Sequence, residues 1–193
     1  MIARSPALVR FVLLASAAGV LAGCGASEPA PDAQASPPKE VSATFATGSG
    51  QAITYDPALV PAGAGITVRT SAANGSTSTT LEVRGLRPDT VYGAHAHVNP
   101  CGATGDAAGP HFQLDQDPVK PSVDPAYANA QNEIWLDLKT DAQGAGTTTS
   151  TNAWEFPADR RAKSVIIHEM ATKTEPGKAG TAGKRPGCVS VDF

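Results

Sequence analysis

The stretch Val91-Tyr-Gly-Ala-His-Ala-His97 decides the expected fold, because its β-branched, aromatic and small apolar residues are typical of a buried strand. Side chains two positions apart on a strand point to the same face, so His95 and His97 are expected to lie side by side. A His-x-His pair is more often a polar strand face than a pair of metal ligands. This stretch alone therefore indicates a strand and leaves the role of its histidines open.

Short apolar and β-branched runs recur along the chain, separated by turn residues such as Ala73-Asn-Gly75 and Asp141-Ala-Gln-Gly144. Short strands with turn signals at this spacing indicate an all-β sandwich or barrel. No stretch has a convincing helical period. The expected strands are residues 41–45, 52–55, 66–68, 79–83, 91–97, 134–138, 147–151, 164–168 and 189–193.

Residues 98–132 are the exception, with several Gly, Pro and Asp residues and little apolar pattern. A loop of this length inside a compact domain is usually functional or the result of a wrong assignment. It begins beside His97 and contains His111, so we expect it to carry part of the functional site.

The first 24 residues are predicted to be a lipoprotein signal peptide. Arg4 and Arg10 form a positive segment, and residues 11–21 form an apolar core too short to span a bilayer as a helix. The core ends in Leu21-Ala-Gly-Cys24, which resembles the bacterial lipobox, so Cys24 is expected to be lipidated and to anchor an exported protein to the cell membrane. The alternative is an ordinary signal peptide with a chance cysteine.

Residues 25–40, rich in Ala, Pro and Ser, predict a disordered linker, followed by one domain at 41–193.

The charge of the chain argues against a nucleic-acid partner. Fifteen Lys and Arg face 18 Asp and Glu, and removal of Arg4 and Arg10 leaves 13 against 18, a net charge of −5. Nucleic-acid binding needs a basic footprint instead.

Two cysteines remain beyond Cys24, namely Cys101 and Cys188, and an oxidising compartment favours a disulfide between them. Metal ligation by the two thiolates is the alternative.

The chain has four histidines, all in apolar or glycine-flanked stretches: His95, His97, His111 in Gly109-Pro-His-Phe112, and His168 in Val165-Ile-Ile-His-Glu169. Singly, His168 could be a buried core histidine and His111 a surface one. Together, four imidazoles without a companion thiol suit copper or zinc rather than calcium or magnesium.

These segments resemble the copper/zinc superoxide dismutases from about residue 41 to the C-terminus. The resemblance implies a Greek-key β-sandwich or barrel, immunoglobulin-like with eight strands, and a long metal-site loop. It is carried by Gly85-Leu86, Tyr92-Gly-Ala-His-Ala-His97, Cys101, Ala108-Gly-Pro-His-Phe112, Thr140-Asp-Ala-Gln-Gly144, Ser164-Val-Ile-Ile-His-Glu169 and Ala182-Gly-Lys-Arg-Pro-Gly-Cys188.

The resemblance also implies a role for individual residues. His95, His97 and His168 correspond to copper ligands, and His111 to the histidine that bridges copper and zinc and carries a proton. Cys101 and Cys188 correspond to the disulfide of the family. Arg185 corresponds to the arginine that guides superoxide, a role that suits a permanently charged guanidinium. The alternative for Arg185 is a surface arginine, since Lys184 precedes it.

Two departures from the family pattern resemble its copper-only members. No histidine lies between Phe112 and Thr140, where the family has further zinc ligands, and the segment 169–184 is shorter than the usual electrostatic loop. The carboxylates that remain there, Asp115, Asp117 and Asp124, make a poor zinc site with one imidazole. The expected cofactor is therefore copper without zinc.

Without zinc, a carboxylate is expected to hold the second ring nitrogen of His111. Glu133 is the first candidate and Asp124 the second, with a solvated carboxylate as the alternative for each.

The expected function is that of a superoxide dismutase at the cell surface, which converts superoxide to oxygen and hydrogen peroxide. His111 would carry the proton to the peroxide and Arg185 would attract the anion. The alternative is an exported copper-binding lipoprotein without turnover, which has no need of an anion guide such as Arg185. An adhesive or structural sandwich would have no need of the complete histidine set.

Overall fold

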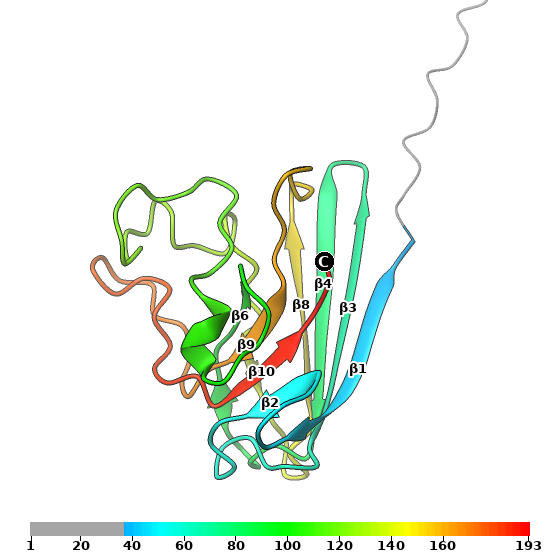
Figure 1. Cartoon of the computed structure of the whole chain (residues 1–193). Helices are drawn as coiled ribbons and strands as arrows, with labels where there is room; N and C mark the ends of the chain where they lie inside the picture. The colour runs from blue at the N-terminus through cyan, green and yellow to red at the C-terminus, as the bar shows by residue number, and fades with distance from the viewer. Residues whose placement is uncertain (1–36) are drawn as a thin grey trace, which may run out of the picture. The chain divides into compact units, whose positions relative to one another are not determined.

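The computed structural model describes residues 37–193; the expected signal peptide, Cys24 and most of the expected linker lie outside them. The described residues form an all-β domain (Figure 1). Among them, no helix has the length and apolar character that a bilayer span requires. The elements are β1 Lys39–Ala46, β2 Ala52–Thr54, β3 Gly65–Ala73, β4 Ser76–Arg84, β5 Val91–Tyr92, β6 Ala94–His97, the 3₁₀ helix η1 Gly105–Ala108, β7 Leu138–Lys139, β8 Gly146–Asn152, β9 Ser164–Ile167 and β10 Gly187–Ser190.

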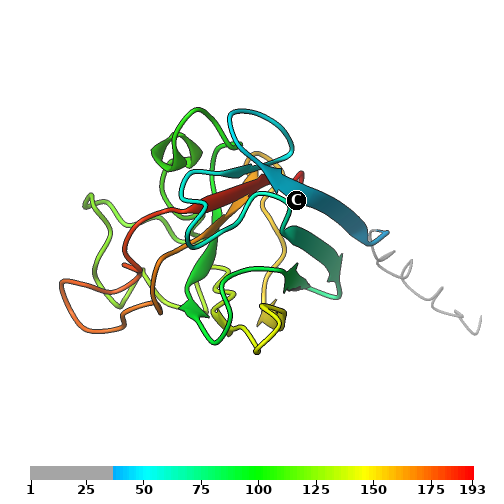
Figure 2. The ribbon, with the colours of Figure 1, turned by 90° about the horizontal axis from the view of Figure 1, so that it is seen from below.

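Eight strands form one curled sheet in the order β6-β9-β10-β2-β1-β3-β4-β8, and β5 pairs with β7 in a two-stranded sheet. All pairs are antiparallel except β1 with β2. The loops that contain residues 98–132 and 169–186 lie together in both views, on the side of the domain away from β1 (Figures 1 and 2). The four histidines lie on β6, directly after β9 and in the loop at 98–132.

The β3–β4 hairpin shows why the outer half of the sheet folds as the sequence predicts. Alternate residues of both strands are buried, including Val68 and Leu81, while the residues between them are more exposed. Its turn contains Asn74 and Gly75 with φ of 53° and 74°, a conformation that an Asn-Gly pair tolerates best. The alternation directs one face of this hairpin into the core.

Strand β9 connects this core to the site. Val165 and Ile167 are fully buried in the main core, together with Val68 and Leu81. Ile166, on the opposite face of β9, is also fully buried and packs with Ala108 and Cys188. Since both faces of β9 are covered, the histidine that follows it is held at a fixed position.

The expected strand at 91–97 is interrupted at Gly93. The amide of Gly93 donates to the carbonyl of Met170 at 2.8 Å instead of joining a ladder. A Cβ at Gly93 would lie 2.7 Å from that carbonyl oxygen, so only glycine permits this approach. The prediction of one strand was wrong here: β5 and β6 belong to different sheets.

The expected strand at 134–138 was also wrong as a continuous strand. Ile134, Leu136 and Leu138 are buried, so the alternation was correctly assigned. The backbone, however, contacts β6 through an isolated bridge between Trp135 and His95, and only the last residue belongs to β7. The side chains of Trp135 and Asp137 do not lie on a sheet surface. The indole N–H of Trp135 donates to Glu133, and the carboxylate of Asp137 accepts from Thr172.

Candidate metal centre

Four histidine side chains converge beside β6. One ring nitrogen each from His95, His97, His111 and His168 lies within 4.8 Å of the others, and these four are the only such group of His, Cys, Asp or Glu within residues 37–193. His95 and His97 occupy alternate positions of β6, and His168 directly follows β9, the neighbour of β6. His111 comes from the long loop and reaches β6 through a single backbone bridge to His97. The four predicted histidines are therefore brought together.

The ring of His97 has a defined outer partner. Its Nδ1 lies 2.9 Å from the carbonyl of Gly109, which can only accept, so Nδ1 carries the hydrogen and Nε2 has a lone pair. This Nε2 lies 3.4 Å from Nε2 of His168. The Nδ1 of His168 is buried and has no hydrogen-bond partner within residues 37–193. A cation between the two Nε2 atoms would be bound by a lone pair from each ring.

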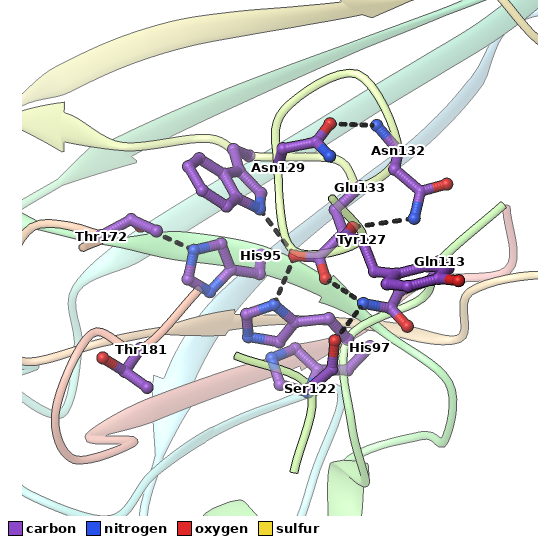
Figure 3. Close-up of polar contacts among 12 residues, drawn as sticks. His95, His97, Gln113, Ser122, Tyr127, Asn129, Asn132, Glu133, Thr172 and Thr181 are labelled. Carbon is purple, nitrogen blue, oxygen red and sulfur yellow. Dashed lines mark hydrogen bonds and ion pairs between the residues drawn. The ribbon is translucent and has the colours of Figure 1, made fainter. Parts of the chain in front are cut away.

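The ring of His95 is oriented by Thr172. Its Nε2 lies 2.7 Å from Oγ1 of Thr172 (Figure 3). This hydroxyl in turn lies 2.6 Å from Oδ1 of Asp137. A hydroxyl has one hydrogen, which goes to the carboxylate, so Thr172 accepts from His95 Nε2–H. The opposite nitrogen, Nδ1, is buried and without a hydrogen-bond partner among the described residues. The lone pair of that nitrogen is thus available to a metal.

Thr172 and Asp137 are functional residues that sequence reasoning missed. Asp137 also accepts from the backbone amide of Thr172 at 2.8 Å, so the two residues are joined twice. A signal was present for Asp137, which is a carboxylate on an otherwise apolar run at 134–138. For Thr172 the segment offers no pattern, because its contact depends on how the loop at 169–186 folds back.

Glu133 contacts His111, as expected from the sequence. Its Oε2 accepts from His111 Nδ1 at 2.7 Å, and the carboxylate also accepts from Gln113 Nε2 at 2.8 Å and Trp135 Nε1 at 2.7 Å (Figure 3). Glu133 is almost fully buried, and these donors compensate its charge. The other nitrogen of His111, Nε2, is left free for the centre of the cluster.

The second candidate, Asp124, is not brought to His111. It is exposed and its Oδ1 accepts from the backbone amide of Ala126 at 2.9 Å, which stabilises its own turn. Asp117 is buried but is bonded to Ser122 and to the amide of Val119. These carboxylates support the loop.

Three of the histidines are held neutral. Burial lowers the pKa of His95 and of His97 well below the usual 6.5, and the nearby ring of His111 adds to the effect. Burial likewise lowers the pKa of His168 to about 3. Neutral imidazoles are the form that binds metal, so the site is prepared for a cation at neutral pH.

Arg185 lies beside the cluster. Its Nη1 donates to the carbonyl of Gly109 at 2.8 Å, the same oxygen that His97 uses, and to that of Gly105 at 3.2 Å. Its side chain is 24% exposed, and its ion pair with Asp106 spans 3.8 Å to a carboxylate that is 94% exposed. Burial lowers the pKa of Arg185, but a guanidinium remains protonated in proteins. Arg185, His111 and His168 line one cavity of about 460 Å³.

Cys101 and Cys188 form the expected disulfide, which excludes the alternative that their thiolates bind metal. The bond ties the beginning of the long loop to β10. Since Arg185 precedes Cys188 by three residues, the disulfide also fixes the segment that carries the guanidinium.

Four neutral or hydrogen-bond-oriented imidazoles and no thiolate form a donor set that fits copper. Three of them are fixed by strands, and each has an outer partner or a buried free nitrogen. Such a site can hold a redox-active ion next to a cation that attracts anions.

No family model matches the chain, and no curated protein matches it either. Among solved structures, the chain is similar to a Cu/Zn superoxide dismutase from Brucella abortus, with 20% identity and a TM-score of 0.55 over 80% of this chain and 100% of that one. It is also similar to a SOD-like protein from Bacillus subtilis, with 20% identity and a TM-score of 0.51 over 74% and 99% of the two chains. These likenesses show the fold, and they confirm the expected all-β class.

Proposed function

We propose that this chain, which has the fold of the Cu/Zn superoxide dismutases, is a copper-dependent superoxide dismutase of copper-only type. The reaction takes two superoxide anions and two protons to one oxygen and one hydrogen peroxide. The observation that carries the proposal is the convergence of four imidazoles, two of which, His111 and His168, line a cavity together with the half-buried Arg185.

His95, His97, His111 and His168 would hold the copper. When bound, copper supplies one-electron exchange in both directions. The fit rests on the unpartnered Nδ1 of His95 and on the 3.4 Å approach of Nε2 of His97 to Nε2 of His168. We include no zinc, because Glu133 occupies the outer nitrogen of His111 that a second metal would need.

Arg185 binds and orients the anion in this proposal. Removal of Arg4 and Arg10 from the 15 Lys and Arg leaves 13 cations against 18 acids, a net charge of −5, so the overall field of the mature chain repels superoxide. A local positive charge in a cavity offsets this repulsion and raises the association rate. Two carbonyls hold the guanidinium in place, which limits the entropy lost when an anion binds.

His111 transfers the proton. Glu133 fixes the hydrogen on Nδ1, so Nε2 is the atom that takes up a proton and gives it to the peroxide. His111 suits this task because it lies on a loop and its side chain is 14% exposed, which leaves it in contact with solvent protons.

The proposed location is the outer face of a bacterial cell membrane, through a lipid on Cys24. The disulfide supports an oxidising compartment. Mass mapping of the exported protein tests the anchor: the expected result is a lipid-modified Cys24, and an unmodified peptide that crosses Gly23-Cys24 would contradict it.

A second candidate is a copper-binding protein without turnover. It is favoured by one observation: the Arg185 guanidinium already donates to two carbonyls, so it could be a structural clamp. Arg185→Glu separates the two candidates, with Lys184→Glu as the matched control, because Lys184 is an exposed neighbour and undergoes the same charge change.

The experiment measures superoxide decay over a range of ionic strengths, with copper and zinc content determined on the same samples. We expect one copper and no stoichiometric zinc in each protein. Turnover and its salt dependence should fall for Arg185→Glu and change little for Lys184→Glu. Full activity of Arg185→Glu with unchanged salt dependence would favour the copper-binding candidate, and a tightly held zinc would exclude the copper-only type.

A further inference from the structure

A second concave site borders the metal centre on the far side of His111. It is a groove of about 590 Å³ between the loop after β6 and the connection from β8 to β9. The groove and the metal-site cavity share Pro110, His111, Gln113 and Lys120. An occupant of the groove would therefore lie next to His111 without entering the histidine cluster.

The charged lining of the groove is mostly positive. Its cations are Lys120, Arg160, Arg161 and Lys163, and its carboxylates are Asp159 and Asp192. The whole chain has a net charge of −3, so this is a positive region on an acidic protein. None of these four cations lies within ion-pair distance of an Asp or Glu side chain in the part of the chain that the structure describes. Arg161 Nη1 donates to the oxygen of Phe193 at 3.3 Å.

Arg160 is the fixed cation of the groove. Its guanidinium donates to the carbonyls of Gln113, at 2.6 Å, and Leu114, and it lies 5.3 Å from the centre of the Phe112 ring. Carbonyls and a ring face orient a guanidinium without neutralising it, and two bonds leave further N–H donors available. The positive charge is thus held in position before any ligand arrives.

The two carboxylates do not cancel this charge. Asp192 is 94% exposed and its nearest cation is Lys39, at 3.7 Å. Asp159 is exposed as well. Both are screened by water, whereas Arg160 is half-buried over Phe112, where its field is screened less.

We propose that this groove binds a small organic anion, whose phosphate or carboxylate group meets Arg160, Arg161 and Lys163. The apolar part of the ligand would rest on Val98 and Pro110, which line the same groove. The volume lies in the range of about 300 to 1,000 Å³ found for small-molecule sites, which is far more than an inorganic ion fills. This site is independent of the dismutase proposal, since no part of it requires a metal.

Calorimetric titration of the full chain with phenyl phosphate, inorganic phosphate and phenol tests the inference, with and without bound metal. We expect phenyl phosphate to bind about tenfold more tightly than inorganic phosphate, because the ring buries apolar area, and phenol to bind weakly. Binding should persist after metal removal. Binding that disappears with the metal would place the anion in the metal centre and overturn the proposal.

The double variant Arg161→Gln, Lys163→Gln removes two exposed cations. It keeps Arg160 and its bonds to the carbonyls of Gln113 and Leu114. It should weaken phenyl phosphate binding about tenfold, the value of one lost charge-assisted hydrogen bond. The matched control is Arg87→Gln with Lys139→Gln, two exposed cations that do not line the groove. Equal weakening in both proteins, or binding of long polyphosphate but not phenyl phosphate, would show a nonspecific charge effect and exclude the site.

Discussion

The three histidines carried by strands differ from the one carried by a loop. His95 and His97 are held by the β6–β9 ladder, and His168, directly after β9, donates its amide to the carbonyl of Gly93 at 2.7 Å; all three are almost fully buried. His111 reaches β6 through one bridge and keeps 14% of its side chain exposed. Neutral groups or backbone position the strand histidines, whereas a charged carboxylate, Glu133, positions His111.

This difference separates ligation from proton transfer. Strand histidines have little freedom and are kept neutral by burial, which suits permanent ligands. A loop histidine can move by a fraction of an ångström without breaking a ladder, and its charged partner stabilises the ring when it is protonated. In the proposed enzyme, three histidines therefore serve only as ligands, and His111, the fourth ligand, also changes its protonation state.

The largest expected effect is acid unfolding of the metal-free chain. It tests the three strand-held histidines, His95, His97 and His168, which we call the strand set. The pKa of His168 is lowered from 6.5 to about 3 by burial, and those of His95 and His97 are also well below 6.5. Between pH 6.5 and about 3, the unfolded chain binds a proton at His168 that the folded chain does not bind. The free energy of unfolding should therefore fall progressively as pH drops through this window.

Denaturant unfolding of the metal-free chain between about pH 7 and pH 4 measures this dependence. Copper-loaded protein should lose less stability over the same range, because the metal keeps the rings deprotonated. A metal-free chain with the same stability at both ends of the range would contradict the neutral, buried state of the strand histidines.

Substitution of one strand histidine and of the loop histidine tests the difference between them directly. His168→Ala removes a fixed ligand and should weaken copper binding by more than the roughly 10- to 100-fold that loss of a supporting partner costs. His111→Ala should weaken it less and reduce turnover per bound copper more. Competition with a copper chelator gives the affinities, and equal losses in the two variants would contradict the division between strand and loop.

Glu133→Gln removes the charge that holds His111 and keeps the size of the side chain. Turnover should fall by roughly 10- to 100-fold while copper stays bound, because His111 loses its charged acceptor. Asp124→Asn is the matched control, since this exposed carboxylate makes no contact with His111 and should leave turnover unchanged. Equal turnover in the two variants would mean that Glu133 stabilises its loop and does not act on His111.

Much of this arrangement could be predicted from the sequence, because it depends on local pattern. The alternation in β3 and β4, the Asn74-Gly75 turn and the His-x-His pair each follow from residues close together in the chain. Glu133 was predicted as the partner of His111 through the family resemblance, whose segments include the turn glycine Gly144. That glycine is required, since a Cβ there would lie 2.1 Å from the carbonyl oxygen of Leu86.

The rest depends on contacts between distant segments. The interruption at Gly93 is caused by the carbonyl of Met170, and the pairing of 134–138 is limited by side chains that turn toward the site. The bond from His95 to Thr172 joins residues 77 positions apart. No local period reveals where such a loop folds back, so this outer partner became visible only in the structure.

Thr172→Val gives the smallest expected effect and sharpens the description of the strand set. Valine has the shape of threonine but no acceptor, so His95 Nε2–H loses its partner at 2.7 Å and its tautomer is no longer fixed. Copper affinity should fall about tenfold, the lower end for loss of a supporting partner. The loss is limited because Asp137 Oδ1 already lies 3.9 Å from His95 Nε2 and can move closer.

Two variants make this result specific to the hydroxyl. Thr172→Ser keeps the acceptor and the bond to Asp137, so it should restore wild-type affinity. Thr181→Val removes an exposed hydroxyl that bonds only to the Lys178 carbonyl at 2.7 Å, and it should have no effect. Chelator competition and the electron paramagnetic resonance spectrum of bound copper are measured together, because a shifted spectrum reports His95 rather than overall stability. Wild-type affinity and spectrum in Thr172→Val would mean that β6 alone fixes His95, and the strand set would then need no hydrogen-bonded support beyond its own backbone.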